Sequence, residues 1–152
     1  MPISISINES KCLRIVRFEG AISAQDMKAL LVLYSQNRDW LGYDSFYLLD
    51  ADSADLDTDQ LDRLRQEAFS LYRDIDLIIV RRTAWIPKNA EMRRLAEYWI
   101  TARHSRDGTS AEFCLGDNLE NALGLFTPED VESVRTGAGF REIAHIGAAA
   151  GV

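Results

Sequence analysis

The sequence predicts an α/β domain with a mixed, mostly parallel sheet flanked by helices, and with an antiparallel hairpin at its N-terminal end. Ile and Ser alternate over residues 3–7, which is the period of a half-buried strand. After residue 23, helical and strand-like segments alternate, a pattern typical of parallel strands joined by crossover helices. The chain has 152 residues, 47% of them hydrophobic, which suits one domain with its own core.

The predicted hairpin covers residues 3–20, with a polar turn at residues 8–11. A helix is expected to begin after Ser23, a good N-cap with Asp26 three residues further on. Apolar residues then recur at helical spacing and give this helix one buried face. They are Met27, Leu30, Leu31 and Tyr34.

Three short apolar runs, residues 45–50, 77–80 and 111–115, predict further strands, and we interpret the last as a central strand. Cys12 and Cys114 are expected to be buried, inert strand residues. Trp85 is expected in a loop, where it serves a partner surface or a dimer interface. Two helices are predicted between the strands. Their buried stripes are Leu61, Leu64, Ala68 and Leu71, and then Met92, Leu95, Ala96, Trp99 and Ile100.

The C-terminal part predicts two short helices, the first capped by Asp117 or Asn118. The second begins at Thr127-Pro128, because proline is favoured in the first helical turn, and ends near Arg135. We therefore place the folded domain at residues 1–136 and a partly flexible tail at residues 137–152.

Composition and motifs exclude several classes of function. The chain has 17 Lys and Arg against 24 Asp and Glu, and this net negative charge disfavours nucleic acid and anionic membranes as partners. It shows no apolar run long enough to span a membrane and no signal peptide, so a cytoplasmic protein is expected. The sequence has no Gly-rich phosphate loop and no His pair at ligand spacing, so no cofactor and no metal are predicted.

The acidic segment, residues 50–62, holds six Asp and neither Lys nor Arg. One interpretation is a solvated strand-to-helix loop with ordinary helix capping. Another is a surface that binds a basic protein partner. A calcium loop fails, because Gln60 and Gln66 replace the required Gly and Glu.

A magnesium-dependent phosphohydrolase of the haloacid-dehalogenase type is a further alternative. Asp50 and Asp52 match its Asp-x-Asp motif after a strand, with Asp50 as the nucleophile. Thr83, Lys88 and Asp117 follow in the order that this chemistry needs. The alternative requires Asp50, Asp52 and Asp117 to converge within metal-bridging distance.

Three segments carry a resemblance to a known family: the hairpin that leads into the helix at Ser23, residues 37–44 before a strand ending at Asp50, and residues 117–123. With these segments the chain resembles the STAS superfamily, specifically the SpoIIAA-like proteins of bacteria. The resemblance implies a STAS-like fold. It also implies a non-enzymatic regulatory module that binds a protein partner, as the anti-sigma-factor antagonists do.

The resemblance also points to a site. Those antagonists carry the pattern Asp-Ser-Ser-Gly, and the corresponding residues here are Asp57-Thr58-Asp59-Gln60, with Asp59 in place of the phosphorylated serine. The partner would be a kinase or another regulator, and phosphorylation at Ser53 or Thr58 would gate its docking. The predicted partner-binding residues are Asp50, Asp52, Ser53, Asp57, Thr58 and Asp59. A homodimer, and a small apolar ligand held between sheet and helices, stay open as alternatives.

Overall fold

The computed structural model describes residues 2–72, 80–101 and 110–147. It contains a six-stranded mixed sheet with the order β5-β4-β3-β2-β1-β6. The strands are β1 (Ile3–Asn8), β2 (Leu13–Ser23), β3 (Asp44–Asp55), β4 (Val80–Pro87), β5 (Ser110–Leu115) and β6 (Arg141–Ile146). The helices are α1 (Ala24–Gln36), α2 (Thr58–Tyr72), α3 (Ala90–Thr101) and α4 (Pro128–Thr136), with short 3-10 helices η1 (Arg38–Gly42) and η2 (Leu119–Ala122).

The predicted hairpin and the mixed sheet are confirmed. β1 pairs antiparallel with β2, so that Ile3 lies opposite Phe18, and the β2–β3, β3–β4 and β4–β5 pairs are parallel. Cys12 lies in the turn between β1 and β2 with a φ of 52° and is exposed, so the expectation of a buried strand cysteine was wrong there. The tight turn needs a residue in the left-handed region at this point.

Local capping explains where the helices begin. The Ser23 Oγ accepts from the Asp26 N–H at 3.2 Å, and the Asp26 carboxylate accepts from the Ser23 N–H at 3.0 Å, so α1 starts with a complete capping box. Thr127 caps α4 by accepting from the Asp130 N–H at 3.1 Å. Both predicted helix starts are confirmed, because these signals are local and do not depend on the rest of the fold.

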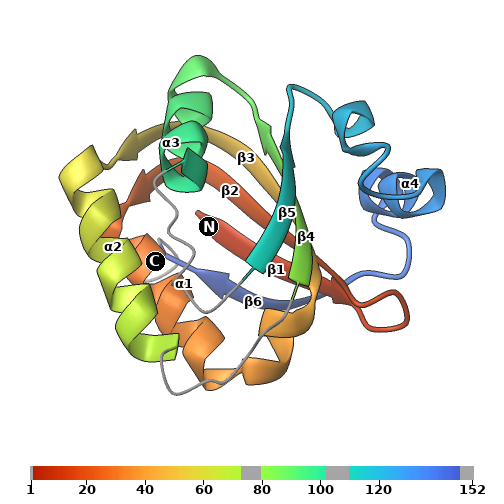
Figure 1. The fold of residues 1–152 in the computed structure, drawn as a ribbon, viewed down its shortest axis with the longest axis horizontal. Coiled ribbons are helices and arrows are strands. Elements are labelled where there is room, and N and C mark those ends of the chain that lie inside the picture. The colour runs from red at the N-terminus through yellow and green to blue at the C-terminus, as the bar shows by residue number, and fades with distance from the viewer. Residues whose placement is uncertain (1, 73–79, 102–109, 148–152) are drawn as a thin grey trace.

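The sheet is covered on both faces. Figure 1 shows α1, α2 and α3 on one side of the strands and α4 on the other. Val16 and Phe18 of β2 face the core under α1–α3, whereas Ile15 faces the core under α4. The same alternation along β3 confirms that this strand is buried on both faces, although it runs further, to Asp55.

Three elements differ from the sequence-based expectation. β4 covers residues 80–87, so Trp85 lies in a strand and not in a loop; residues 77–79 of the predicted strand lie outside the described part. β5 is an edge strand and not a central one. Residues 141–146, expected in the tail, form β6 and pair antiparallel with β1, a partner that is distant in sequence.

Two smaller observations complete the fold. Leu71, predicted in the buried stripe of α2, is 38% exposed at the end of that helix. None of the described helices is both long enough and apolar enough to cross a membrane.

Candidate functional site

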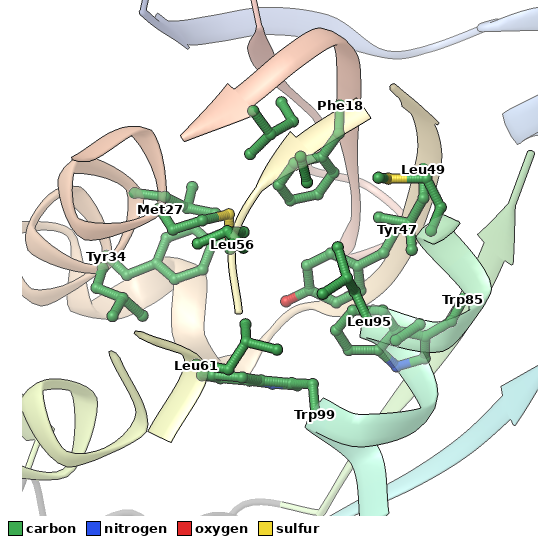
Figure 2. Close-up of a pocket in the computed structure, with 16 residues that line it drawn as sticks. Phe18, Met27, Tyr34, Tyr47, Leu49, Leu56, Leu61, Trp85, Leu95 and Trp99 are labelled. Carbon is green, nitrogen blue, oxygen red and sulfur yellow. The ribbon is translucent and has the colours of Figure 1, made fainter. Parts of the chain in front are cut away.

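A cavity of about 120 Å³ lies between the sheet and helices α1, α2 and α3. Its wall is almost entirely carbon, and every strand from β2 to β4 contributes to it. Figure 2 shows the aromatic side chains that dominate this wall. They are Phe18 from β2, Tyr34 from α1, Tyr47 from β3, Trp85 from β4 and Trp99 from α3.

A bulge in β3 shapes one end of the cavity. Gly20 of β2 pairs with Ala51, whereas Ala21 pairs with Ser53, so Asp52 is an extra residue in β3. An extra residue reverses the alternation of side chains between the two faces. As a consequence Leu49 lines the cavity before the bulge, and Ala54 and Leu56 line it afterwards.

Two aromatic residues of the wall, Tyr47 and Trp85, have polar groups with hydrogen-bond partners within the protein. The rings of Tyr47 and Trp85 stack with centroids 4.2 Å apart and planes 14° apart. The Trp85 indole N–H donates to the Thr83 Oγ1 at 3.2 Å, and Arg14 donates to the Tyr47 hydroxyl at 3.4 Å. Each polar group of the stacked pair therefore has a hydrogen-bond partner within the protein.

Arg14 joins several elements behind the wall, and it is fully buried. It donates to the Ser45 hydroxyl at 3.0 Å and to the Trp40 carbonyl at 2.8 Å. Its guanidinium also lies 4.4 Å from the centre of the Tyr34 ring. Because one buried cation contacts β3, η1 and α1, it holds two of the aromatic walls, Tyr34 and Tyr47, in fixed positions.

Polar contacts join α2 to α3 beside the cavity. The Arg65 guanidinium lies 4.2 Å from the centre of the Trp99 ring and also donates to the Trp99 carbonyl. The Tyr98 hydroxyl donates to the Asp62 carboxylate at 2.8 Å, and this bond raises the pKa of Tyr98. These contacts position Trp99, the cavity residue that α3 contributes near α2.

The predicted carboxylates of β3 form ion pairs. Arg17 binds Asp50 at 2.6 Å, and Lys88 binds Asp52 at 3.0 Å. The hydrogen bond that Lys88 donates to the Asp52 carboxylate raises the pKa of Lys88. Local cations thus offset part of the acidity of this segment.

Asp57 caps helix α2. It accepts from the Gln60 N–H at 2.8 Å, and the Gln60 side chain accepts from the Asp57 N–H at 2.9 Å. The capping interpretation of the acidic segment is therefore confirmed at Asp57. Thr58 and Asp59 are exposed in the first turn of α2, and Ser53 is exposed on β3; their role in partner binding stays a prediction.

The convergence of carboxylates required by the phosphohydrolase alternative is not found. Asp117 binds Arg93 at 2.6 Å, while Asp50 and Asp52 bind the separate cations described above. Within residues 2–72, 80–101 and 110–147, no three His, Cys, Asp or Glu side chains are grouped to hold a metal ion. That alternative gains no support from the geometry.

The sequence left open a small apolar ligand between sheet and helices but did not identify the residues that would bind it. Trp85, expected in a loop at a partner surface or dimer interface, lies in β4 and stacks on Tyr47 in the cavity wall, so its loop position was wrong and its partner role stays a prediction. The apolar stripe of α3 was identified, and four of its residues line the cavity. These residues are Met92, Leu95, Ala96 and Trp99.

Comparison of the chain with protein-family models, with curated proteins and with solved structures finds no match. We therefore infer the function from the geometry of the site.

Proposed function

We propose that the protein is a non-enzymatic domain that binds a small apolar molecule in the cavity between the sheet and helices α1–α3. The observation that carries this proposal is a cavity of about 120 Å³ with a carbon wall. Protein cores normally pack without such voids. An engineered apolar cavity of about 150 Å³ in another protein stays dry and binds benzene, so a cavity of this size suits a similar ligand.

The same carbon-lined wall disfavours polar ligands. A hydroxyl or charged group that enters a carbon-lined site loses its hydrogen bonds to water and gains none in return. The hydroxyl of Tyr47 and the indole N–H of Trp85 already have partners within the protein. The ligand that fits this wall best is therefore uncharged and predominantly apolar on its buried part.

Binding is tested directly with the purified protein. Native mass spectrometry should reveal a retained ligand, and calorimetric titration with a panel of small hydrocarbons should give saturable binding. We expect Ala96→Leu to abolish binding, because Ala96 lines the cavity and is 3% exposed. Ala122→Leu places the same side chain on the opposite face of the sheet and serves as the control. A folded protein that binds no hydrocarbon and retains none would overturn the proposal.

The acidic segment supports a second function that is compatible with the first. Ala54 and Leu56 line the cavity, while the neighbouring Ser53, Asp57 and Thr58 are exposed. A ligand that moves the Ala54–Leu56 backbone would therefore move the outward-facing side chains beside it. We propose, together with the STAS-like resemblance, that this segment binds a protein partner in a ligand-dependent way.

This second function has its own test. Asp57→Asn and Asp59→Asn remove the negative charge, and asparagine at position 57 keeps the ability to cap α2. We expect the double variant to lose a partner that the unmodified protein retains in affinity capture. Glu132→Gln on α4 changes an exposed carboxylate far from the segment and is the matched control. An identical set of captured proteins for the double variant would exclude this role of Asp57 and Asp59.

A further inference from the structure

We propose that the ligand of the cavity is a neutral, planar aromatic ring. This inference rests on the proposed function and specifies the chemical class of the ligand. It follows from the arrangement of aromatic side chains around the cavity and from the charges that lie behind them.

Aromatic rings from four elements surround the centre of the cavity. Figure 2 shows Phe18, Tyr34, Tyr47 and Trp99 around an open middle, with Trp85 stacked against Tyr47. The quadrupoles of aromatic rings favour edge-to-face or offset contacts with another ring at centroid distances of about 4.5–7 Å. A single ring at the centre meets several such partners at once. A saturated molecule of the same size meets the same walls without these contacts.

A cage of aromatic rings is also a common way to bind a cation. Here two cations already occupy ring faces. The Arg14 guanidinium lies 4.4 Å from the centre of the Tyr34 ring, and that of Arg65 lies 4.2 Å from the centre of the Trp99 ring. A cationic ligand would share these rings with two positive charges, and no Asp or Glu belongs to the residues described as lining the cavity. These charges disfavour a cation in the cage.

An anionic ligand is disfavoured by desolvation. A carboxylate in the cavity would exchange its water for a wall that is almost entirely carbon, and the Trp85 N–H already donates to Thr83. The buried cation Arg14 is not among the lining residues and binds Ser45 and Trp40. Charge of either sign therefore weakens binding, and the aromatic contacts remain as the source of selectivity.

The test compares ligands that match in size and differ in chemistry. Isothermal titration of the full chain with benzene and with cyclohexane, both of six carbons, measures the preference for a π-system. We expect benzene to bind about three- to tenfold more tightly, the range that aromatic pairs give beyond area burial. Tetramethylammonium and benzoate, the charged probes, should give no detectable heat at the same concentrations.

A second measurement uses the ratio of the two dissociation constants within one variant. Phe18→Leu removes a ring that is 4% exposed and keeps an apolar wall, and Phe126→Leu, the same change under α4 on the other face of the sheet, is the control. We expect the preference for benzene to fall towards unity in Phe18→Leu and to persist in Phe126→Leu. Retained binding of cyclohexane shows that the variant is folded.

Each outcome separates the two proposals. Equal or tighter binding of cyclohexane overturns the aromatic class and leaves the proposed function standing. Tighter binding of tetramethylammonium overturns it in favour of a cation cage. An unchanged benzene preference in Phe18→Leu overturns the role given to that ring. Failure of both hydrocarbons to bind the folded protein overturns the proposed function itself.

Discussion

The two faces of the sheet are built from alternate residues of the same strands, yet they pack differently. Under α4, Phe46 meets Phe126 with ring centroids 4.4 Å apart, and the small residues Ala84 and Ala122 are fully buried. Under α1–α3, larger rings surround a cavity of about 120 Å³. Both faces use apolar strand residues, so hydrophobicity alone does not decide whether a face closes.

The difference indicates that the cavity depends on the side chains that hold its aromatic rings in place. Arg14 fixes Tyr34 and Tyr47 from behind, and Arg65 holds Trp99. Cavities in other proteins cost about 24 cal/mol per Å³, which for 120 Å³ gives roughly 3 kcal/mol. A void of this cost in a small domain is consistent with a binding function, because a ligand would recover the lost contacts.

The largest expected effect on stability comes from the face of the sheet under α4, which we call the closed face. Phe46 is fully buried between the sheet and η2–α4, so Phe46→Ala should lower the free energy of unfolding by about 3–5 kcal/mol. Leu123, 45% exposed on the same side of the molecule, is the control. Leu123→Ala should change the free energy of unfolding by less than about 0.5 kcal/mol. Urea denaturation followed by circular dichroism measures both. Equal losses for the two variants would contradict the description of this face as closely packed.

The same Ala→Leu substitution should change the free energy of unfolding in opposite directions on the two faces of the sheet. Ala122→Leu inserts atoms into a filled core and should destabilise the fold by about 1–3 kcal/mol. Ala96→Leu fills the cavity and should stabilise the fold by about 0.5–2 kcal/mol. Thermal and urea denaturation of both variants provide the comparison. If Ala96→Leu is the more destabilising of the two, the cavity is not a space that a side chain can fill.

Removing a helix cap on either face of the sheet should lower the free energy of unfolding by a similar amount, but it should weaken hydrocarbon binding on one face only. Ser23→Ala and Thr127→Ala each remove a capping hydrogen bond and should each cost about 1 kcal/mol. Ser23 begins α1, which supplies Tyr34 to the cavity, whereas Thr127 begins α4 on the closed face. We expect weaker hydrocarbon binding in Ser23→Ala only. A matching loss of affinity in Thr127→Ala would show that the two faces are coupled.

The smallest effect concerns the two cysteines. Burial raises the pKa of the Cys114 thiol, which lies against the core under α4, whereas Cys12 is exposed in a turn. At pH 8 iodoacetamide should therefore modify Cys12 first, as mass spectrometry of peptides will show. Because the folded-state pKa of Cys114 is raised, its contribution to stability is present below the unfolded pKa and declines as the pH rises through the folded one. Simultaneous modification in the native protein would contradict this burial.

Sequence reasoning succeeded where the signals are local. The alternation of Ile3, Ile5 and Ile7 predicted β1, and the pairs Ser23 with Asp26 and Thr127 with Pro128 predicted two helix starts. It failed for β6, whose partner β1 lies more than a hundred residues away in sequence. It also misplaced Trp85, because the strand assignment stopped before residue 81. Pairing of distant segments is a property of the whole chain and leaves a weak local signature.

The candidate site shows the same division. The apolar stripes of α1 and α3 and a capped helix start within the acidic segment follow from the sequence, because the helical period and the first helical turn are set by neighbouring residues. The structure assigns that cap to Asp57. Only the tertiary structure decided that Phe18, Tyr34, Tyr47 and Trp99 meet around one cavity. It also placed Arg14 and Arg65 against two of those rings. The reason is that a cavity is defined by the space between elements, and that space depends on strand order, the bulge at Asp52 and helix placement together.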